Sequence, residues 1–279
     1  MKESVYEVHN FKNEKLPFIF HSDTVLKNKR LYYNWHKNAE ILFVTKGEGK
    51  GLLGEEEIYI KEGDICIVNS NIVHSVSSSL GITYECLIPD ISFCRENGIN
   101  IENLQLDNLI RDEKCAELYR QLISEYKSEK FMIAGVRSAV LNLILYIVRN
   151  YSQEKKGPDL KTRRKTEKNI SFAIDFMNRN FREKLTVEEI AKQSGMSKYY
   201  FLREFKKVTG ITVITFLNIL RCNHAERLIS KGEAVWLAAR KCGYENNSYF
   251  SKVFKKYTGK TPTEYIKSKE KDRNNGIWQ

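Results

Sequence analysis

The stretch TVEEIAKQSG at residues 186–195, followed by YYFLREFKKVTGIT at residues 199–212, is repeated further along the chain. The second copy is AVWLAARKCG at 234–243, followed by SYFSKVFKKYTGKT at 248–261. A short helix, a tight glycine turn and a second helix form the helix-turn-helix unit of DNA-binding proteins. The repeat therefore predicts two helix-turn-helix units in one domain.

The charge of the chain is concentrated in the part that contains the repeat. Residues 1–159 carry 20 Lys and Arg against 23 Asp and Glu, whereas residues 160–279 carry 26 against 12. A strongly basic domain joined to a slightly acidic one is typical of a polyanion binder with a second function. The charge distribution thus supports DNA as the partner of the C-terminal half.

Cysteine usage and hydropathy favour a cytoplasmic protein. The six cysteines show no CxxC spacing, so neither a disulfide framework nor a zinc motif is indicated. Residues 1–10 are polar and charged, unlike a signal peptide. The most apolar stretch, residues 131–148, is interrupted by Arg137 and Asn142, so we expect no membrane association.

Short β-rich runs separated by Gly, Asn and Ser turns occupy residues 15–95. Such runs predict an antiparallel sandwich or barrel, and the glycines at 47 and 49 predict a turn after a strand at 40–45. From about residue 104 the apolar spacing becomes helical, with Leu106, Leu109 and Ile110 on one face. A second helix at 131–151 is apolar around most of its circumference, so it packs under the barrel or forms a subunit interface, or both.

A polar, charged segment at 152–165 that contains Gly-Pro predicts a linker, and everything after it is predicted to be helical. Thr186 with Glu189 matches a capping box, and Ser197 is suited to cap the next helix. One long helix is expected at 212–230. Residues 261–264, Thr-Pro-Thr-Glu, predict the start of a last helix.

Outward side chains on the second helix of each unit are suited to DNA. Arg203 can pair with guanine, Asn247 with adenine, and Tyr199 and Leu202 can contact a thymine methyl, whereas lysines position the protein on phosphates. The predicted DNA contacts are Ser197, Lys198, Tyr199, Leu202, Arg203 and Lys206 in the first unit and Asn246, Asn247, Ser248, Lys252 and Lys255 in the second.

Residues 186–266 resemble the double helix-turn-helix domain of the AraC/XylS family of bacterial transcription regulators, above all in GYENNSYFSKVFKKYTGKTPTEY at 243–265. The resemblance implies that two recognition helices enter successive segments of the major groove. It places base contacts on Tyr199, Leu202 and Arg203 in the first unit, and on Asn247, Ser248 and Lys252 in the second.

The N-terminal half resembles the cupin-type sensor barrel that such regulators often carry, through NWHKNAE at 34–40, Gly63-Asp64 and His74. Metal-holding cupins usually present His-x-His, then a Glu and a distant His. In this chain Asn34 stands at the first histidine, while His36, Glu40 and His74 remain. Three interpretations stay open: a transition-metal site, a histidine satisfied within the barrel, or a metal-free pocket.

We expect a metal-free pocket without a cofactor, and the polar groups at its mouth suit a polyhydroxylated molecule such as a sugar. Strand alternation points Tyr32, Asn34 and His36 the same way. The predicted ligand-binding residues are Tyr32, Asn34, His36, Glu40 and His74.

The sequence predicts an α+β multidomain protein. Its expected parts are a cupin-like barrel (1–103), a helical segment that can form a dimer interface (104–151), a linker (152–165), a double helix-turn-helix domain (166–269) and a tail (270–279). We expect a non-enzymatic transcription regulator, an activator that responds to a small molecule. Its expected partners are promoter DNA, the effector, a second copy of the chain and RNA polymerase.

Two alternatives come from other functional classes. A metal-dependent cupin enzyme with a DNA-targeting domain would need the complete ligand set that Asn34 interrupts. A ligand-independent DNA-binding protein would use its barrel only to dimerise. Bound metal would favour the first, and the absence of any response to metabolites would favour the second.

Overall fold

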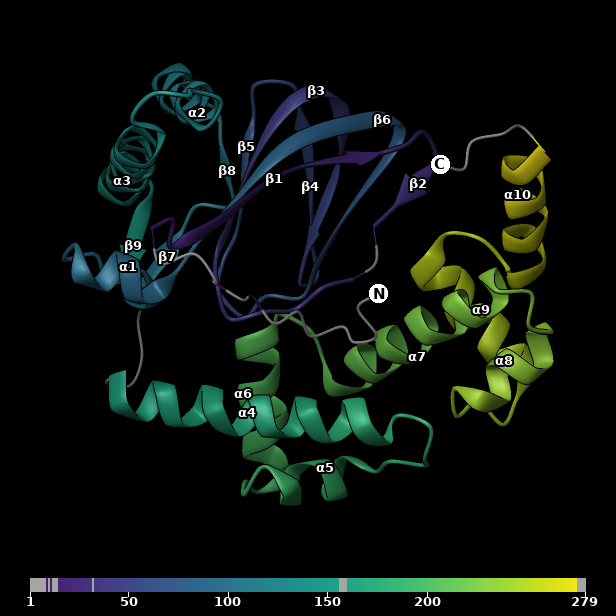
Figure 1. The fold of residues 1–279 in the computed structure, drawn as a ribbon. Coiled ribbons are helices and arrows are strands. Elements are labelled where there is room, and N and C mark those ends of the chain that lie inside the picture. The colour runs from purple at the N-terminus through teal and green to yellow at the C-terminus, as the bar shows by residue number, and fades with distance from the viewer. Residues whose placement is uncertain (1–8, 10, 12–14, 32, 156–159, 275–279) are drawn as a thin grey trace. The chain divides into compact units, whose positions relative to one another are not determined.

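The structure is a computed structural model that describes residues 9, 11, 15–31, 33–155 and 160–274. The chain divides into two compact units near residue 164. We call residues 7–163 the barrel domain and residues 164–279 the helical domain, and each is described by itself (Figure 1).

The barrel domain is built on an antiparallel seven-stranded sheet in the order β1-β6-β3-β5-β8, in which β2 pairs with β6 and β4 with β3. Two long strands, β3 and β6, form its centre and pair along most of their length. The strands are β1 (Phe18–Val25), β2 (Lys29–Arg30), β3 (Glu40–Leu53), β4 (Glu56–Lys61), β5 (Ile65–Val68), β6 (His74–Pro89) and β8 (Leu109–Ile110).

Side-chain alternation along the strands separates two apolar cores. On β3, Ile41 and Phe43 belong to a core that includes helices α2 (Glu113–Tyr126) and α3 (Met132–Asn150). Leu42 and Val44 point to the other face, into a core whose fully buried residues all lie on strands. Glu40 lies two residues before Leu42, so its side chain belongs to that second face of the sheet.

The glycines at 47 and 49 do not form the predicted turn. β3 continues through them, and its pairing with β6 shifts register between Val44 and Lys46 and again between Glu48 and Lys50. Gly47 has φ +79°, and a Cβ there would lie 2.2 Å from the carbonyl oxygen of Gly81. The glycine signal therefore marks a β-bulge where two backbones approach closely, which also requires positive φ.

The boundary expected at residue 104 is also different. Leu106 lies in β7 (Leu104–Leu106), which pairs with β9 (Ser152–Glu154), and Leu109 and Ile110 form β8 on the edge of the main sheet. Their apolar spacing fitted a helix equally well, but strand pairing determines their conformation. The predicted linker is correspondingly short, because β9 and the start of α4 (Leu160–Asn180) lie within it.

The predicted apolar helix is α3, and one of its faces lies in the core. Six residues of α3 are buried, and α2 packs along it. Its length and composition alone would allow a membrane span, but about a third of the apolar window is buried in the barrel domain. The short helix α1 (Ile91–Glu96) and the 3-10 turn η1 (Ile101–Asn103) connect the sheet to this layer.

The helical domain consists of seven helices in its described part: α4 and then α5 (Val187–Gln193), α6 (Lys198–Thr209), α7 (Val213–Ser230), α8 (Val235–Lys241), α9 (Asn247–Thr258) and α10 (Pro262–Asn274). Both predicted capping boxes form. Thr186 and Glu189 bond each other's backbone amides before α5, and Thr261 and Glu264 do so at α10. The helix predicted at 212–230 is α7, capped by Thr212.

Candidate functional site

Helices α6 and α9 are the second helices of the two helix-turn-helix units and are built alike. Each has 12 residues and ends at a glycine in the left-handed conformation, Gly210 or Gly259. One face of each helix is fully buried through a phenylalanine pair, namely Phe201 with Phe205 and Phe250 with Phe254. The repeat in the sequence thus produces two equivalent helices that each leave one face outside the core.

The turns before these helices require glycine. Gly195 and Gly243 have φ +67° and +78°, where L-residues are strained. A Cβ on Gly195 would meet no atom of the described residues within 4 Å, whereas a Cβ on Gly243 would lie 2.7 Å from the carbonyl oxygen of Arg182. The second turn therefore depends on glycine for both conformation and space.

Most residues predicted to contact DNA from the first unit face solvent. Tyr199 is 82% exposed. Ser197, Arg203 and Lys206 are also exposed, and Lys198 and Leu202 are half-buried. Ser197 occupies the N-cap position but makes no capping bond with its side chain, so the expected cap is wrong.

The second unit presents Asn247, Ser248, Lys252 and Lys255 as exposed side chains on α9. Asn246 is exposed as well, but its Oδ1 accepts a hydrogen bond from the backbone N–H of Tyr249 at 2.8 Å. Asn246 therefore caps α9, and only its amide nitrogen remains to donate to DNA.

Acidic neighbours hold two of the candidate DNA contacts in the first unit. Lys198 forms an ion pair with Glu188 of α5. The Nε of Arg203 lies 3.0 Å from Glu204, and its guanidinium stacks 5.1 Å from the ring centre of Tyr200. The lysine and the arginine are at the surface, where ion pairs contribute little, so a DNA phosphate or base can replace these partners.

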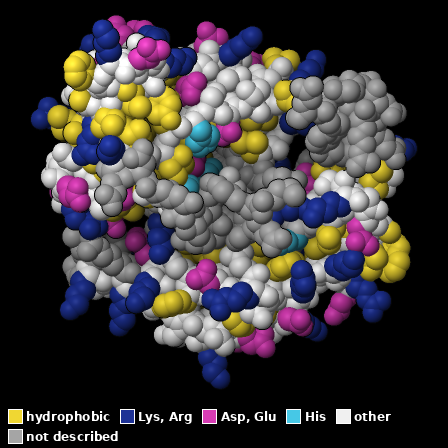
Figure 2. All heavy atoms as spheres, in the orientation of Figure 1, with side chains coloured by type: hydrophobic (Ala, Val, Ile, Leu, Met, Phe, Trp, Pro, Cys, Tyr) yellow, Lys and Arg dark blue, Asp and Glu magenta, His cyan; other side chains and the backbone are white. Residues whose placement is uncertain are grey.

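A groove beside the start of α9 was not predicted from the sequence. Its lining includes Arg182, Lys184, Trp236, Arg240 and Tyr249. Arg182 and Lys184 precede the repeat, and Trp236 and Arg240 lie on α8, a helix for which the repeat indicated only a packing role. The one sequence signal for this groove was Trp236, a large aromatic residue that is exposed on α8. In Figure 2, Lys and Arg side chains (dark blue) project from the helical domain.

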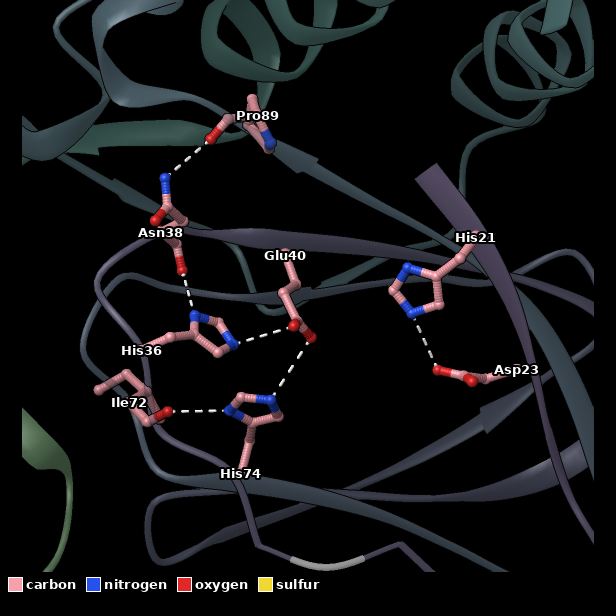
Figure 3. Close-up of polar contacts among 8 residues, drawn as sticks. All are labelled: His21, Asp23, His36, Asn38, Glu40, Ile72, His74 and Pro89. Carbon is pink, nitrogen blue, oxygen red and sulfur yellow. Dashed lines mark hydrogen bonds and ion pairs between the residues drawn. The ribbon is translucent and has the colours of Figure 1, made fainter. Parts of the chain in front are cut away.

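In the barrel domain, His36, Glu40 and His74 come together as a buried cluster (Figure 3). The Nε2 of His36 lies 2.9 Å from one carboxylate oxygen of Glu40, and the Nε2 of His74 lies 3.4 Å from the other. The Nδ1 atoms of the two rings face the carbonyl oxygens of Asn38 and Ile72, at 2.8 and 3.0 Å. Three of the five predicted ligand-binding residues therefore share one site.

The environment of the cluster shifts the pKa values of its three members in different directions. Burial raises the pKa of Glu40, but the two imidazoles outweigh it and hold that pKa well below the usual value. Burial lowers the pKa of His36, and Glu40 offsets this only in part. Burial also disfavours the protonated form of His74. The negative charge of Glu40 and its hydrogen bond to the ring outweigh that effect, so the pKa of His74 is raised.

The other two predicted ligand-binding residues are placed differently. Asn34 is half-buried and forms an isolated backbone bridge with His74, which brings the two ends of the cluster together. Tyr32 lies outside the described residues.

His9 belongs to the cluster although no sequence pattern pointed to it. Its ring centre lies 4.4 Å from that of His36, and ligand atoms of His9, His36 and Glu40 lie within 4.8 Å of one another. His9 is 27 residues from His36 and outside any strand, so neither spacing nor alternation connects the two in the sequence.

Comparison with protein-family models covers both domains. A model described as an AraC-like ligand binding domain matches residues 26–144, and a helix-turn-helix domain model matches residues 190–268. The chain belongs to the AraC family of transcription regulators. The matches confirm the predicted resemblance of the helical domain and assign ligand binding to the barrel domain.

Relatives within the AraC family cover most of the chain. The uncharacterised HTH-type regulator YbfI of Bacillus subtilis is 27% identical, over 77% of this chain and 80% of its own. The HTH-type transcriptional activator RhaR of an Enterobacter species is 24% identical, over 82% and 85%. The structure of ToxT from Vibrio cholerae covers 90% of this chain and 98% of its own, with a TM-score of 0.52 and 16% identity, which shows the shared fold.

Proposed function

We propose that this AraC-family regulator is an activator that binds a bipartite promoter site through α6 and α9. The equivalence of these two helices carries the proposal, because each has a buried phenylalanine pair on one side and polar, cationic or aromatic side chains on the other. Two such helices joined through α7 suit successive segments of one major groove.

Each recognition helix carries its own base contacts in this proposal. Arg203 pairs with guanine and Tyr199 and Leu202 contact thymine methyl groups, whereas Asn247 pairs with adenine and Ser248 and Lys252 flank it. Phosphates are contacted by the lysines at 198, 206 and 255.

The groove beside α9 extends this interface. Arg182, Lys184 and Arg240 bring three cationic side chains next to the start of the helix, and Trp236 and Tyr249 supply aromatic surface. A DNA phosphate in this groove would meet cations together with the positive end of α9.

For the barrel domain we propose a hydroxylated effector, a carbohydrate, bound next to His36, Glu40 and His74. The support is chemical: a carboxylate and two imidazoles in one buried cluster can match hydroxyl groups with both donors and acceptors. The effector acts by changing how two subunits, paired through α3, present their helical domains to DNA. The protein works in the cytoplasm with RNA polymerase and has no catalytic role.

The test is recovery of genomic fragments of the source organism by the purified protein at near-physiological salt, followed by sequencing. Enrichment of a few promoters that share a bipartite site supports the proposal, and the genes next to them name the pathway. Recovery of fragments in proportion to their abundance contradicts it. A thermal-shift series with sugars against apolar molecules of equal size tests the effector class separately.

A further inference from the structure

Four side chains with metal-ligating atoms meet in the barrel domain near the starts of β3 and β6, where Glu40 and His74 lie. Ligand atoms of His9, His36 and Glu40 lie within 4.8 Å of one another, and His74 faces the far oxygen of Glu40. We propose that this cluster binds one divalent transition-metal ion, with His9, His36 and Glu40 as ligands and His74 as the residue that positions Glu40. The inference goes beyond the proposed function and does not depend on DNA binding. With the ion in place, an effector at this site would contact the ion rather than the Nε2 of His36.

The ring of His36 is already oriented for a metal. Its Nδ1 lies 2.8 Å from the carbonyl oxygen of Asn38, and a carbonyl oxygen only accepts, so Nδ1 carries the hydrogen. The Nε2 atom therefore turns toward Glu40 (Figure 3). Metal-ligating histidines nearly always donate their other ring N–H to a carbonyl or carboxylate, which fixes the tautomer and exposes the ligating lone pair.

The Nε2 of His36 and a carboxylate oxygen of Glu40 lie 2.9 Å apart, and the ring of His36 is 1% exposed. His74 has the same arrangement, with its Nδ1 facing the carbonyl oxygen of Ile72 and its Nε2 facing the other oxygen of Glu40. One divalent ion would use the lone pairs that His36 and Glu40 turn toward each other.

The distances suit a first-row transition metal. Ligand atoms that lie 2.0–2.2 Å from one ion are about 3–4 Å from each other. The separation of 2.9 Å between His36 and Glu40 meets this value, and the 4.8 Å limit on the whole set requires only a small inward movement. Two imidazoles and one carboxylate favour zinc, iron(II), cobalt or nickel over calcium and magnesium, which take oxygen ligands.

His9 supplies the imidazole that the sequence pattern lacks. Asn34 stands where a metal-binding barrel of this type offers its first histidine, and its backbone is bridged to His74. The ring of His9 instead reaches the cluster from the N-terminal segment and lies 4.4 Å from the ring of His36. Because His9 comes from outside the strands, the site does not need a histidine at position 34.

The experiment uses the full chain without an affinity tag, stripped with a chelator and reloaded with Zn²⁺ or Co²⁺. Metal content is measured by mass spectrometry, and the Co²⁺ protein by visible absorption. We expect one ion per chain, a higher melting temperature for the loaded protein, and Co²⁺ bands that report nitrogen and oxygen ligands.

Variants separate the ligands from their surroundings. His9→Gln and Glu40→Gln should lose stoichiometric metal, and His74→Gln should keep one ion with about 10- to 100-fold weaker binding, as for residues that hold a ligand. His21→Gln is the matched control, because His21 lies on β1 beside Asp23, at 3.1 Å; it should bind metal like the wild type.

Absence of stoichiometric metal in the reloaded wild type overturns the proposal, and so does wild-type affinity in His9→Gln. His9 lies outside the strands, so its substitution remains informative even if Glu40→Gln fails to fold. Binding of DNA is measured on the same stripped and loaded samples, which distinguishes loss of the metal site from failure of the proposed regulator.

Discussion

Two residues of α6 separate the two kinds of DNA contact. Arg203→Ala should cost about 1–3 kcal/mol of binding free energy on the cognate site and relax the preference at one base pair. Lys206→Ala should weaken binding to all sequences alike and reduce the slope of log K against log salt by about one. Fluorescence anisotropy on cognate and scrambled duplexes, over a salt series, measures both effects. Equal losses on the two duplexes for Arg203→Ala would contradict its assigned role.

The two turn glycines provide a matched pair for stability. Both have positive φ, but only Gly243 lacks space, because a Cβ would press on the carbonyl oxygen of Arg182 at 2.7 Å. Gly195→Ala should lower the free energy of unfolding by about 1 kcal/mol, and Gly243→Ala by clearly more. Urea unfolding followed by circular dichroism compares them. A smaller loss for Gly243→Ala would show that the backbone at Arg182 yields.

Among the residue-level predictions from local patterns, the two capping boxes are confirmed and the cap at Ser197 is wrong. The capping pair Thr186 and Glu189 is confirmed because both partners lie within one helical turn. His9 could not be found in this way, since its proximity to His36 arises only from the tertiary fold. The base-contact assignments for α6 and α9 stay predictions.

At the scale of elements, α3 is the proposed dimer interface. Leu145 is half-buried, and neighbours on its face such as Asn142 and Arg149 are exposed, so this side of the helix lies outside the core. Leu145→Glu should convert a dimer to a monomer at micromolar concentration, because a buried unpaired charge at an interface is costly. Gln121→Glu on the exposed side of α2 is the control. Sedimentation equilibrium decides, and a monomeric wild type would contradict the interface.

Helices were predicted more accurately than strands. The apolar run at 131–151 and the helix at 212–230 match α3 and α7 to within one or two residues, because their periodicity extends over several turns. The helix predicted to begin at 104–110 was wrong, because the few apolar residues there fit the spacing of a helix and of a strand equally well. Pairing of this segment with β5 and β9 makes it two short strands. The bulge at Gly47 resembled a turn because both need positive φ.

At the scale of the whole molecule, all six cysteines are buried and unpaired by disulfides. Burial raises the pKa of Cys66, Cys94, Cys115 and Cys242 to about 12, so their reactive thiolates are scarce at pH 8. A thiol reagent at pH 8 should label almost none of them in the native protein and all six in denaturant. Rapid labelling of the native protein would show that a core opens readily.

The division into a sheet-rich and a helical domain was predictable because charge and periodicity change together along the chain. The excess of Lys and Arg after residue 160 coincides with the helical domain that the repeat predicted. The chemistry of the effector site was harder to predict from the sequence, because the residues of the barrel cluster come from three separate segments of the chain.

Selection from a random DNA library tests the central claim most directly, because it asks whether α6 and α9 each specify half of one site. The wild type should select two half-sites about 10–10.5 base pairs apart. Arg203→Ala should degrade one half-site and Asn247→Ala only the other. A single undivided motif, or the same loss in both variants, would contradict the account.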